Sequence, residues 1–178
     1  YPKVDWLEVS KNFIQSLGLE LNSYTTQIEP HDAFAAVFDV TKRINSIVLD
    51  FVRDMWLYIS IGYFSQKVVG KEVGSSTMPH KVNPINFENS EGNLGLANSM
   101  FEFFGRKLPI SRLQRDLSDS TVERSFGSAF AYAYVAYVSL LQGLSKISVN
   151  REVILADLNE HPEIIAEARK GGDTELTT

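Results

Sequence analysis

The chain has no cysteine among its 178 residues, which excludes disulfides and cysteine-ligated metal sites. It also has no apolar run long enough to cross a bilayer and no secretory signal at its start. A chain without cysteine fits a reducing compartment, and we expect a cytoplasmic protein with no membrane partner.

Positive charge is the scarcer sign: 17 Lys and Arg stand against 22 Asp and Glu, for a net charge of −5. This balance argues against nucleic acid as a partner. The charge is unevenly spread, because residues 67–124 hold eight basic and seven acidic side chains while the remainder holds nine and fifteen. A site for an anion is therefore expected in the middle segment.

No stretch shows a convincing strand pattern, and no internal repeat is present. Apolar residues instead recur every three or four positions and predict helices over about 6–17, 32–64, 85–105 and 120–147, with shorter helices starting near 151 and 162. The sequence predicts an all-α bundle of long helices with a short-helix C-terminal extension. We expect residues 1–145 to be part of the bundle domain and residues 146–178 to begin a smaller helical domain with a disordered tail.

Local signals place the helix ends. Asp5 is expected to cap the first helix, which Gly18 closes. Ser120, with Glu123 three residues on, is expected to cap the helix that runs to about 147. That helix is apolar nearly all round and is expected to be buried on most sides. In the first helix, Trp6, Val9, Phe13 and Leu17 fall at helical spacing and are expected in the core. The predicted wide apolar face of the second helix consists of Phe34, Val37, Phe38, Thr41, Ile44, Val48, Phe51, Met55, Tyr58 and Ile59.

Residues 74–84 read Gly-Ser-Ser-Thr-Met-Pro-His-Lys-Val-Asn-Pro and are the most informative stretch of the chain. Asn83 is an expected N-cap, with Pro84 in the first helical position. A helix start attracts anions, and Lys81 adds a positive charge just ahead of it. A serine loop joined to such a helix start is the layout of a loop that closes on an anionic substrate. The alternative is a plain connector, which many Gly/Ser-rich loops are.

These eleven residues resemble the signature of the fumarase/aspartase superfamily, Gly-Ser-Ser-x-Met-Pro-x-Lys-x-Asn-Pro. Within that superfamily, residues 25–32, 87–93 and 111–124 resemble the bacterial branch of the adenylosuccinate lyase family. The resemblance covers about residues 1–167. It implies a long-helix bundle of the fumarase/aspartase type, a homotetramer whose sites each combine three subunits, and no metal or organic cofactor.

The resemblance also implies a reaction, the release of fumarate from adenylosuccinate and from the succinyl-carboxamide ribotide of purine synthesis. The substrate is then a small anionic nucleotide. By matching motif position, Ser75 is the general base, while Lys81 and Asn83 stabilise the charge that builds on the substrate carboxylate. The implied substrate-binding residues are Gln27, Ser75, Lys81, Val82, Asn83, Asn89, Arg115, Ser120, Thr121, Val122, Glu123 and Arg124.

A serine hydroxyl is a very weak acid, so the role of Ser75 requires a positive field and a dry site. Arginine suits a phosphate, which agrees with the implied roles of Arg115 and Arg124. The alternative for these two arginines is salt bridges with neighbouring acidic residues. Likewise, Lys81 and Asn83 have the simpler interpretations of a surface lysine and a helix cap.

One family feature has no counterpart here: the general-acid histidine, which the family places upstream of these residues. The three histidines, His31, His80 and His161, are expected to be structural or solvated, and their spacing predicts no metal site. Because Tyr1 is not a methionine and the tail lacks an apolar pattern, we expect a piece of a longer polypeptide. Because the general-acid histidine of the family has no counterpart, we expect this piece to be inactive alone. Two other functions stay open, a sister lyase acting on argininosuccinate and a helical assembly module without catalysis.

Overall fold

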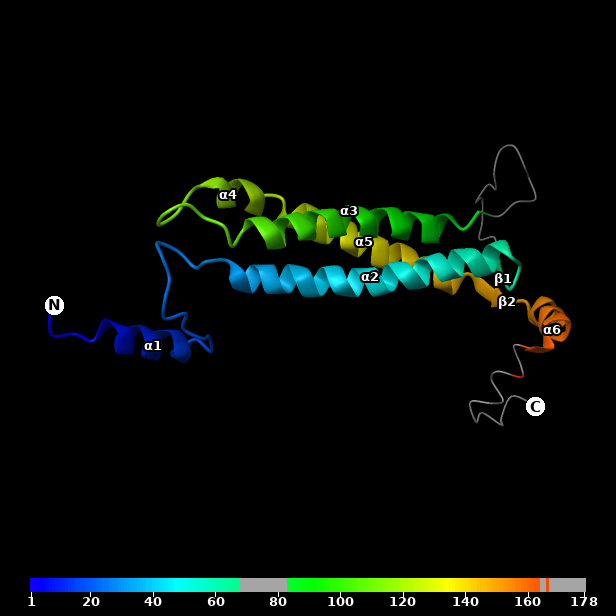
Figure 1. The fold of residues 1–178 in the computed structure, drawn as a ribbon, viewed down its shortest axis with the longest axis horizontal. Coiled ribbons are helices and arrows are strands. Elements are labelled where there is room, and N and C mark those ends of the chain that lie inside the picture. The colour runs from blue at the N-terminus through cyan, green and yellow to red at the C-terminus, as the bar shows by residue number, and fades with distance from the viewer. Residues whose placement is uncertain (68–82, 164–165, 167–178) are drawn as a thin grey trace.

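The computed structural model describes residues 1–67, 83–163 and 166 of the chain. The long helices α2 (Asp32–Ser60), α3 (Ile85–Lys107) and α5 (Phe126–Ser145) lie side by side (Figure 1), and α3 contacts both of the others. The remaining elements are α1 (Trp6–Ser16), β1 (Phe64–Gln66), α4 (Ser118–Glu123), β2 (Ile147–Val149) and α6 (Arg151–Glu160). The predicted all-α bundle is therefore confirmed.

Within the described ranges, no helix combines the length and the apolar character that crossing a membrane requires.

Two buried clusters hold the three long helices together. One is aromatic: Phe38 of α2 meets Phe101 and Phe104 of α3, with ring centroids 5.7 and 5.3 Å away. The other, toward the opposite end of the bundle, joins Val52 and Met55 of α2 to Phe87 of α3. Burying a side chain of this size stabilises a fold by about 1.5–3 kcal/mol, so these clusters fix α2 against α3.

A polar pair crosses the bundle between these clusters. The Tyr137 hydroxyl of α5 donates a hydrogen bond to Oδ1 of Asn45 of α2. Asn45 is fully buried, and its amide nitrogen has no partner among the described residues. Burial raises the pKa of the Tyr137 hydroxyl above its ordinary value, so the group stays protonated and able to donate at neutral pH.

The prediction that α1 contributes to the core is wrong for the single chain. Trp6, Val9, Phe13 and Leu17 are all exposed, Phe13 by 61%. The reason is that α1 lies to one side of the bundle (Figure 1). Its local prediction is confirmed, because the Asp5 carboxylate accepts hydrogen bonds from the N–H groups of residues 7 and 8.

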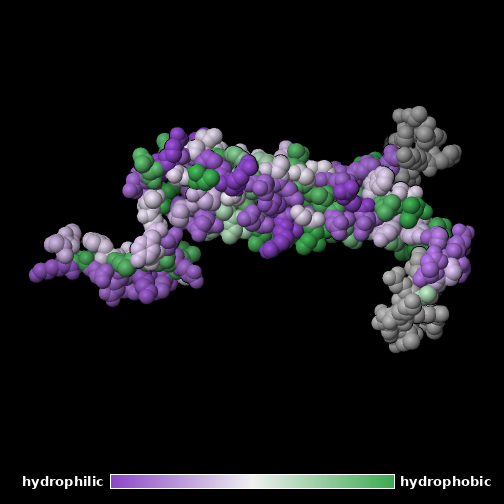
Figure 2. All heavy atoms as spheres, viewed as in Figure 1, coloured by the Kyte–Doolittle hydropathy of each residue, from purple (hydrophilic) through white to green (hydrophobic). Residues whose placement is uncertain are grey.

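The apolar face of α2 is also only partly buried. Phe38 and Met55 are in the core as predicted, but Phe34, Val37, Ile44 and Phe51 are exposed. Figure 2 shows hydrophobic side chains reaching the visible surface along the bundle. This face of α2 is too wide for α3, with the few contacts from α5, to cover completely.

The predicted near-complete burial of the last long helix is wrong as well. The helix is interrupted at residues 124 and 125, so α4 and α5 are separate elements. α5 buries a face of small residues, Ala129, Ala133 and Ala136 among them, and leaves aromatic residues exposed on other sides. Small residues let α5 approach α3 closely.

Several predicted helix starts shift by a residue or two. α3 begins at Ile85 with Pro84 as its N-cap, so Asn83 is not the cap. α4 begins at Ser118, which places Ser120 inside the helix, where its hydroxyl donates to the Leu117 carbonyl at 2.9 Å. The Ser120–Glu123 capping box is therefore wrong. For the last predicted helix, Pro162, Glu163 and Ala166 are helical, and residues 164–165 and 167–178 lie outside the described residues.

The two short strands were not predicted from the sequence. β1 and β2 pair antiparallel, with Ser65 opposite Ser148. They join the end of α2 to the end of α5, and the Tyr63 hydroxyl just before β1 donates to the Asp157 carboxylate of α6. Three residues in each strand are too few to produce a recognisable alternation.

Candidate functional site

The predicted site residues that the structure describes lie at two ends of the bundle. Asn83 and Asn89 are at the start of α3, whereas Ser120, Arg124 and their neighbours are on or beside α4, at the opposite end (Figure 1). The 23 residues of α3 span roughly 35 Å at 1.5 Å per residue. One chain therefore does not bring the predicted residues into one site. Ser75, Lys81 and Val82 lie outside the described residues.

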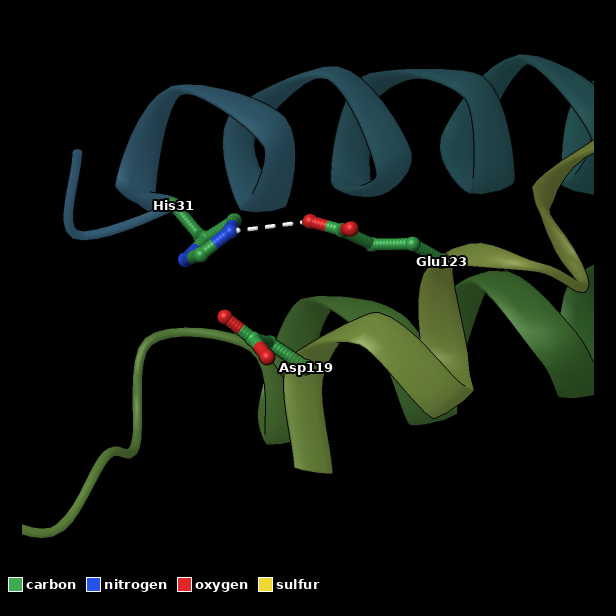
Figure 3. Close-up of side chains that lie close together, drawn as sticks. All are labelled: His31, Asp119 and Glu123. Carbon is green, nitrogen blue, oxygen red and sulfur yellow. Dashed lines mark hydrogen bonds and ion pairs between the residues drawn. The ribbon is translucent and has the colours of Figure 1, made fainter. Parts of the chain in front are cut away.

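The α4 end is organised by a contact between distant parts of the chain. His31, at the start of α2, lies 3.0 Å from Glu123 of α4, measured from Nε2 to Oε1 (Figure 3). The His31 side chain is only 8% exposed. The N–H of His31 also donates to the Glu29 carboxylate at 2.7 Å. These bonds attach α4, with its predicted binding residues, to the segment that contains Gln27.

His31 has a left-handed backbone, with φ of 64°, a conformation that few residues other than glycine adopt. The turn directs its ring toward α4, where it also lies 5.8 Å from the ring of Phe34. The expectation that His31 is structural agrees with this placement. Its partner Glu123 could not be identified from the sequence, because 92 positions separate the two residues.

His31, Asp119 and Glu123 form a group whose ligand atoms all lie within 4.8 Å of one another (Figure 3). These atoms already have partners within the protein. Arg115 Nε donates to Asp119 at 3.3 Å, and the N–H of Ser120 donates to the same carboxylate at 2.6 Å. The proximity of these three side chains is therefore explained by a hydrogen-bond network that connects the start of α2 to α4.

Arg115 and Arg124, the two arginines expected to meet a phosphate, differ in this structure. Arg115 makes the salt bridge with Asp119 that the sequence left open as an alternative. Arg124 is exposed just beyond α4. Arg115 is thus fixed in place, while the Arg124 guanidinium is accessible to a ligand.

The other residues of this end have different exposures. Gln27 and Thr121 are exposed, and Ser120 is half-buried. The Val122 side chain is packed into the aromatic core cluster, so a substrate could contact Val122 only through its main chain. At the other end Asn83 is half-buried and Asn89 is exposed.

A cavity of about 160 Å³ adjoins the His31 network. Its lining includes Thr26, Pro109 and Ile110 together with the carboxylates of Glu29, Asp116 and Asp119. Carboxylates repel a phosphate, so this cavity alone is a poor anion site. An anion at this end would meet the exposed Arg124 instead.

The loop before α4 is held by Asp116. Its carboxylate accepts from the Ser118 hydroxyl, from the Ser118 N–H at 3.0 Å, and from the Arg112 N–H at 3.1 Å. The Ser118 hydroxyl and N–H, together with Arg112, hold the pKa of the Asp116 carboxyl well below its ordinary value. The folded chain therefore favours the charged form of Asp116.

This pKa shift predicts a loss of stability in acid. A carboxyl whose pKa is lowered by folding stabilises the fold above its unfolded pKa of about 3.9, and that stability is lost as the pH falls further. We expect Asp116→Asn to reduce the decrease in urea midpoint between pH ~5 and pH ~2. Asp50→Asn, at an exposed position of α2, is the matched control. Equal acid sensitivity of wild type and Asp116→Asn would contradict this assignment.

Comparisons with known proteins agree along most of the chain. Two family profiles match, "Lyase" over residues 1–98 and "Adenylosuccinate lyase C-terminal" over residues 111–170. The chain is 57% identical over 168 residues to the adenylosuccinate lyases of Legionella pneumophila and Vibrio cholerae, and 55% identical over 167 residues to that of Escherichia coli. Each match covers 94% of this chain but only 37% of the relative. The chain thus spans little more than a third of the length of these curated relatives.

Proposed function

The chain belongs to the lyase family, and from this premise we propose that it is part of an adenylosuccinate lyase. That enzyme eliminates fumarate from adenylosuccinate to give AMP, and from the succinyl-carboxamide ribotide of purine synthesis. The observation that carries the proposal is the 57% identity to adenylosuccinate lyases over nearly the whole chain.

In the proposed reaction, Ser75 takes a proton from the carbon next to a substrate carboxylate. The electron pair of that C–H bond forms the carbon–carbon double bond of fumarate as the C–N bond breaks. Lys81 and Asn83 stabilise the negative charge that builds on the carboxylate, which is the largest contribution such a site makes. The proton for the departing amine comes from a group outside this chain, in accord with the family's upstream histidine.

We further propose that the enzyme is a homo-oligomer, in agreement with the family's tetramer. Two observations support this. The predicted site residues are separated by the length of α3, so a complete site needs residues from more than one copy. The exposed apolar residues of α1, α2 and α5 also provide surface for such contacts.

Two smaller proposals accompany this one. Residues 1–145 belong to the bundle domain and residues 146–178 begin a second, helical domain, since the long helices stop at Ser145. The enzyme works in the cytoplasm, where reducing conditions do not affect a chain that has no cysteine and so no disulfide.

Substrate competition tests the proposed activity. The full-length enzyme that carries this sequence is supplied with adenylosuccinate and argininosuccinate together, and the products are separated. We expect AMP and fumarate to form, with at least ~10³-fold preference over arginine formation, because a site built for polar groups strongly rejects a substrate that lacks them. Arginine as the main product would favour the sister lyase, and no product from either substrate would favour an assembly module.

A further inference from the structure

The chain segments on both sides of residues 68–82 meet at the end of α5. On the upstream side, the N–H of Lys67 donates to the main-chain carbonyl of Lys146 at 2.8 Å. This bond extends the ladder in which Gln66 lies opposite Ile147. On the downstream side, the Lys146 ammonium donates to Oδ1 of Asn86, in the first turn of α3, at 3.2 Å. One residue thus contacts both sides.

Tight packing surrounds this contact. A Cβ added to Gly143 would lie 3.0 Å from the ring of Phe87, so α5 and α3 approach each other as closely as glycine allows. Phe87 is fully buried, and Phe64 of β1 and Ile147 of β2 pack against its cluster. Asn86 Nδ2 also donates to Gln142 at 3.3 Å. The start of α3, the end of α5 and the two strands therefore form one packed unit.

The bond between Lys146 and Asn86 combines a charged donor with partial burial. A hydrogen bond from a charged donor is roughly twice as strong as one between neutral groups. A hydrogen bond also restricts the relative orientation of the two groups that it joins, which the surrounding apolar contacts do not. Lys146 is consequently the residue best placed to set the distance between the strand that ends at Gln66 and the helix that begins at Ile85.

We propose that Lys146 is a positioning residue for the lyase reaction. Lys146, at the end of α5, contacts Lys67 on one side and Asn86 on the other side of the segment that contains Ser75 and Lys81 in the sequence. This inference rests on the proposed function. A change in the spacing of attachment points shifts groups between them, and an error of about 1 Å at a reacting centre can lower the rate ~10²-fold.

The first test is kinetic and uses the full-length enzyme. We expect Lys146→Met to lower kcat for fumarate release about tenfold or more, with KM within about threefold, because positioning is lost while the substrate contacts remain. Lys146→Arg keeps the cation and should restore kcat to within about threefold. Asn86→Ala should also lower kcat, although it removes the bond to Gln142 as well. The losses in Lys146→Met and Asn86→Ala should be less than additive in the double variant, since both remove the Lys146–Asn86 bond.

The matched control is Lys42→Met. Lys42 also bridges two helices, from α2 to Glu102 of α3, but toward the α4 end of the bundle. It should leave kcat unchanged. The proposal is overturned if Lys146→Met retains wild-type kcat, if the Lys146 and Asn86 losses are additive, or if Lys42→Met lowers kcat by the same factor.

Hydrogen exchange separates a failure of this inference from a failure of the proposed function. The amides of Phe87 and Glu88 donate to the Pro84 carbonyl in the first turn of α3. We expect both to exchange several-fold faster in Lys146→Met and at the wild-type rate in Lys146→Arg. If the wild-type enzyme releases no fumarate, the proposed function fails. The exchange rates of the Phe87 and Glu88 amides then test by themselves whether Lys146 holds the start of α3. Unchanged exchange in Lys146→Met would then overturn the role of Lys146.

Discussion

Replacing Ser75 by alanine in the full-length enzyme is expected to lower kcat for fumarate release by about 10²–10⁴-fold, the contribution that a positioned general base makes. KM should change little, because alanine removes a hydroxyl and leaves the other substrate contacts in place. The assay follows fumarate formation under saturating adenylosuccinate. This is the largest effect on activity that we predict for any single substitution.

Ser76→Ala is the matched control for Ser75→Ala, since it removes the same group from the next residue of the same motif. It should retain most of the activity, and both variants should keep the oligomeric state of the wild type in gel filtration. Turnover that survives Ser75→Ala would show that another group is the base. Equal losses in both variants would show that the motif, rather than one hydroxyl, is sensitive to change.

The largest loss of stability is expected for Phe38→Ala. Phe38 is 2% exposed, and its ring lies 4.9 Å from that of Phe126 as well as against Phe101 and Phe104. Removing a buried phenylalanine side chain leaves a cavity and costs about 3–5 kcal/mol in the free energy of unfolding. Urea unfolding of the 178-residue chain, followed by circular dichroism, measures the change.

Phe103→Ala is the control for Phe38→Ala, because Phe103 is on α3 next to the same cluster but is 44% exposed. It should cost less than about 1 kcal/mol. Similar losses for the two variants would contradict the assignment of the aromatic cluster as the core of the bundle. A smaller loss for Phe38→Ala than for Phe103→Ala would show that Phe103, rather than Phe38, contributes more to the stability of the bundle.

The sequence predicted the parts of this fold that depend on neighbouring residues. The three-to-four-residue spacing located α2, α3 and α5, and Asp5 capped α1 as expected. Periodicity identifies an apolar face but does not say what covers it. That is why Phe13, expected in the core, and Phe34, on the predicted apolar face of α2, are both exposed in the single chain.

Contacts between distant residues could not be predicted in this way. The bond between His31 and Glu123 and the ladder between β1 and β2 each join residues more than eighty positions apart. Local patterns contain no information about such pairs. For the candidate site, the motif resemblance supplied the residues, while the structure added their separation along α3 and the network that holds α4 in place.

The hydrogen bond between Asn45 and Tyr137 has a consequence for how α2 and α5 align along their lengths. Alanines and leucines can slide past one another by a turn at small cost, because one apolar contact replaces another. A buried amide has no such freedom: displaced by one turn, the Asn45 oxygen would lose its donor and face hydrocarbon unsatisfied. This polar pair therefore selects one axial alignment of α2 against α5. The alignment in turn sets where the functional groups at each end of the two helices lie relative to one another.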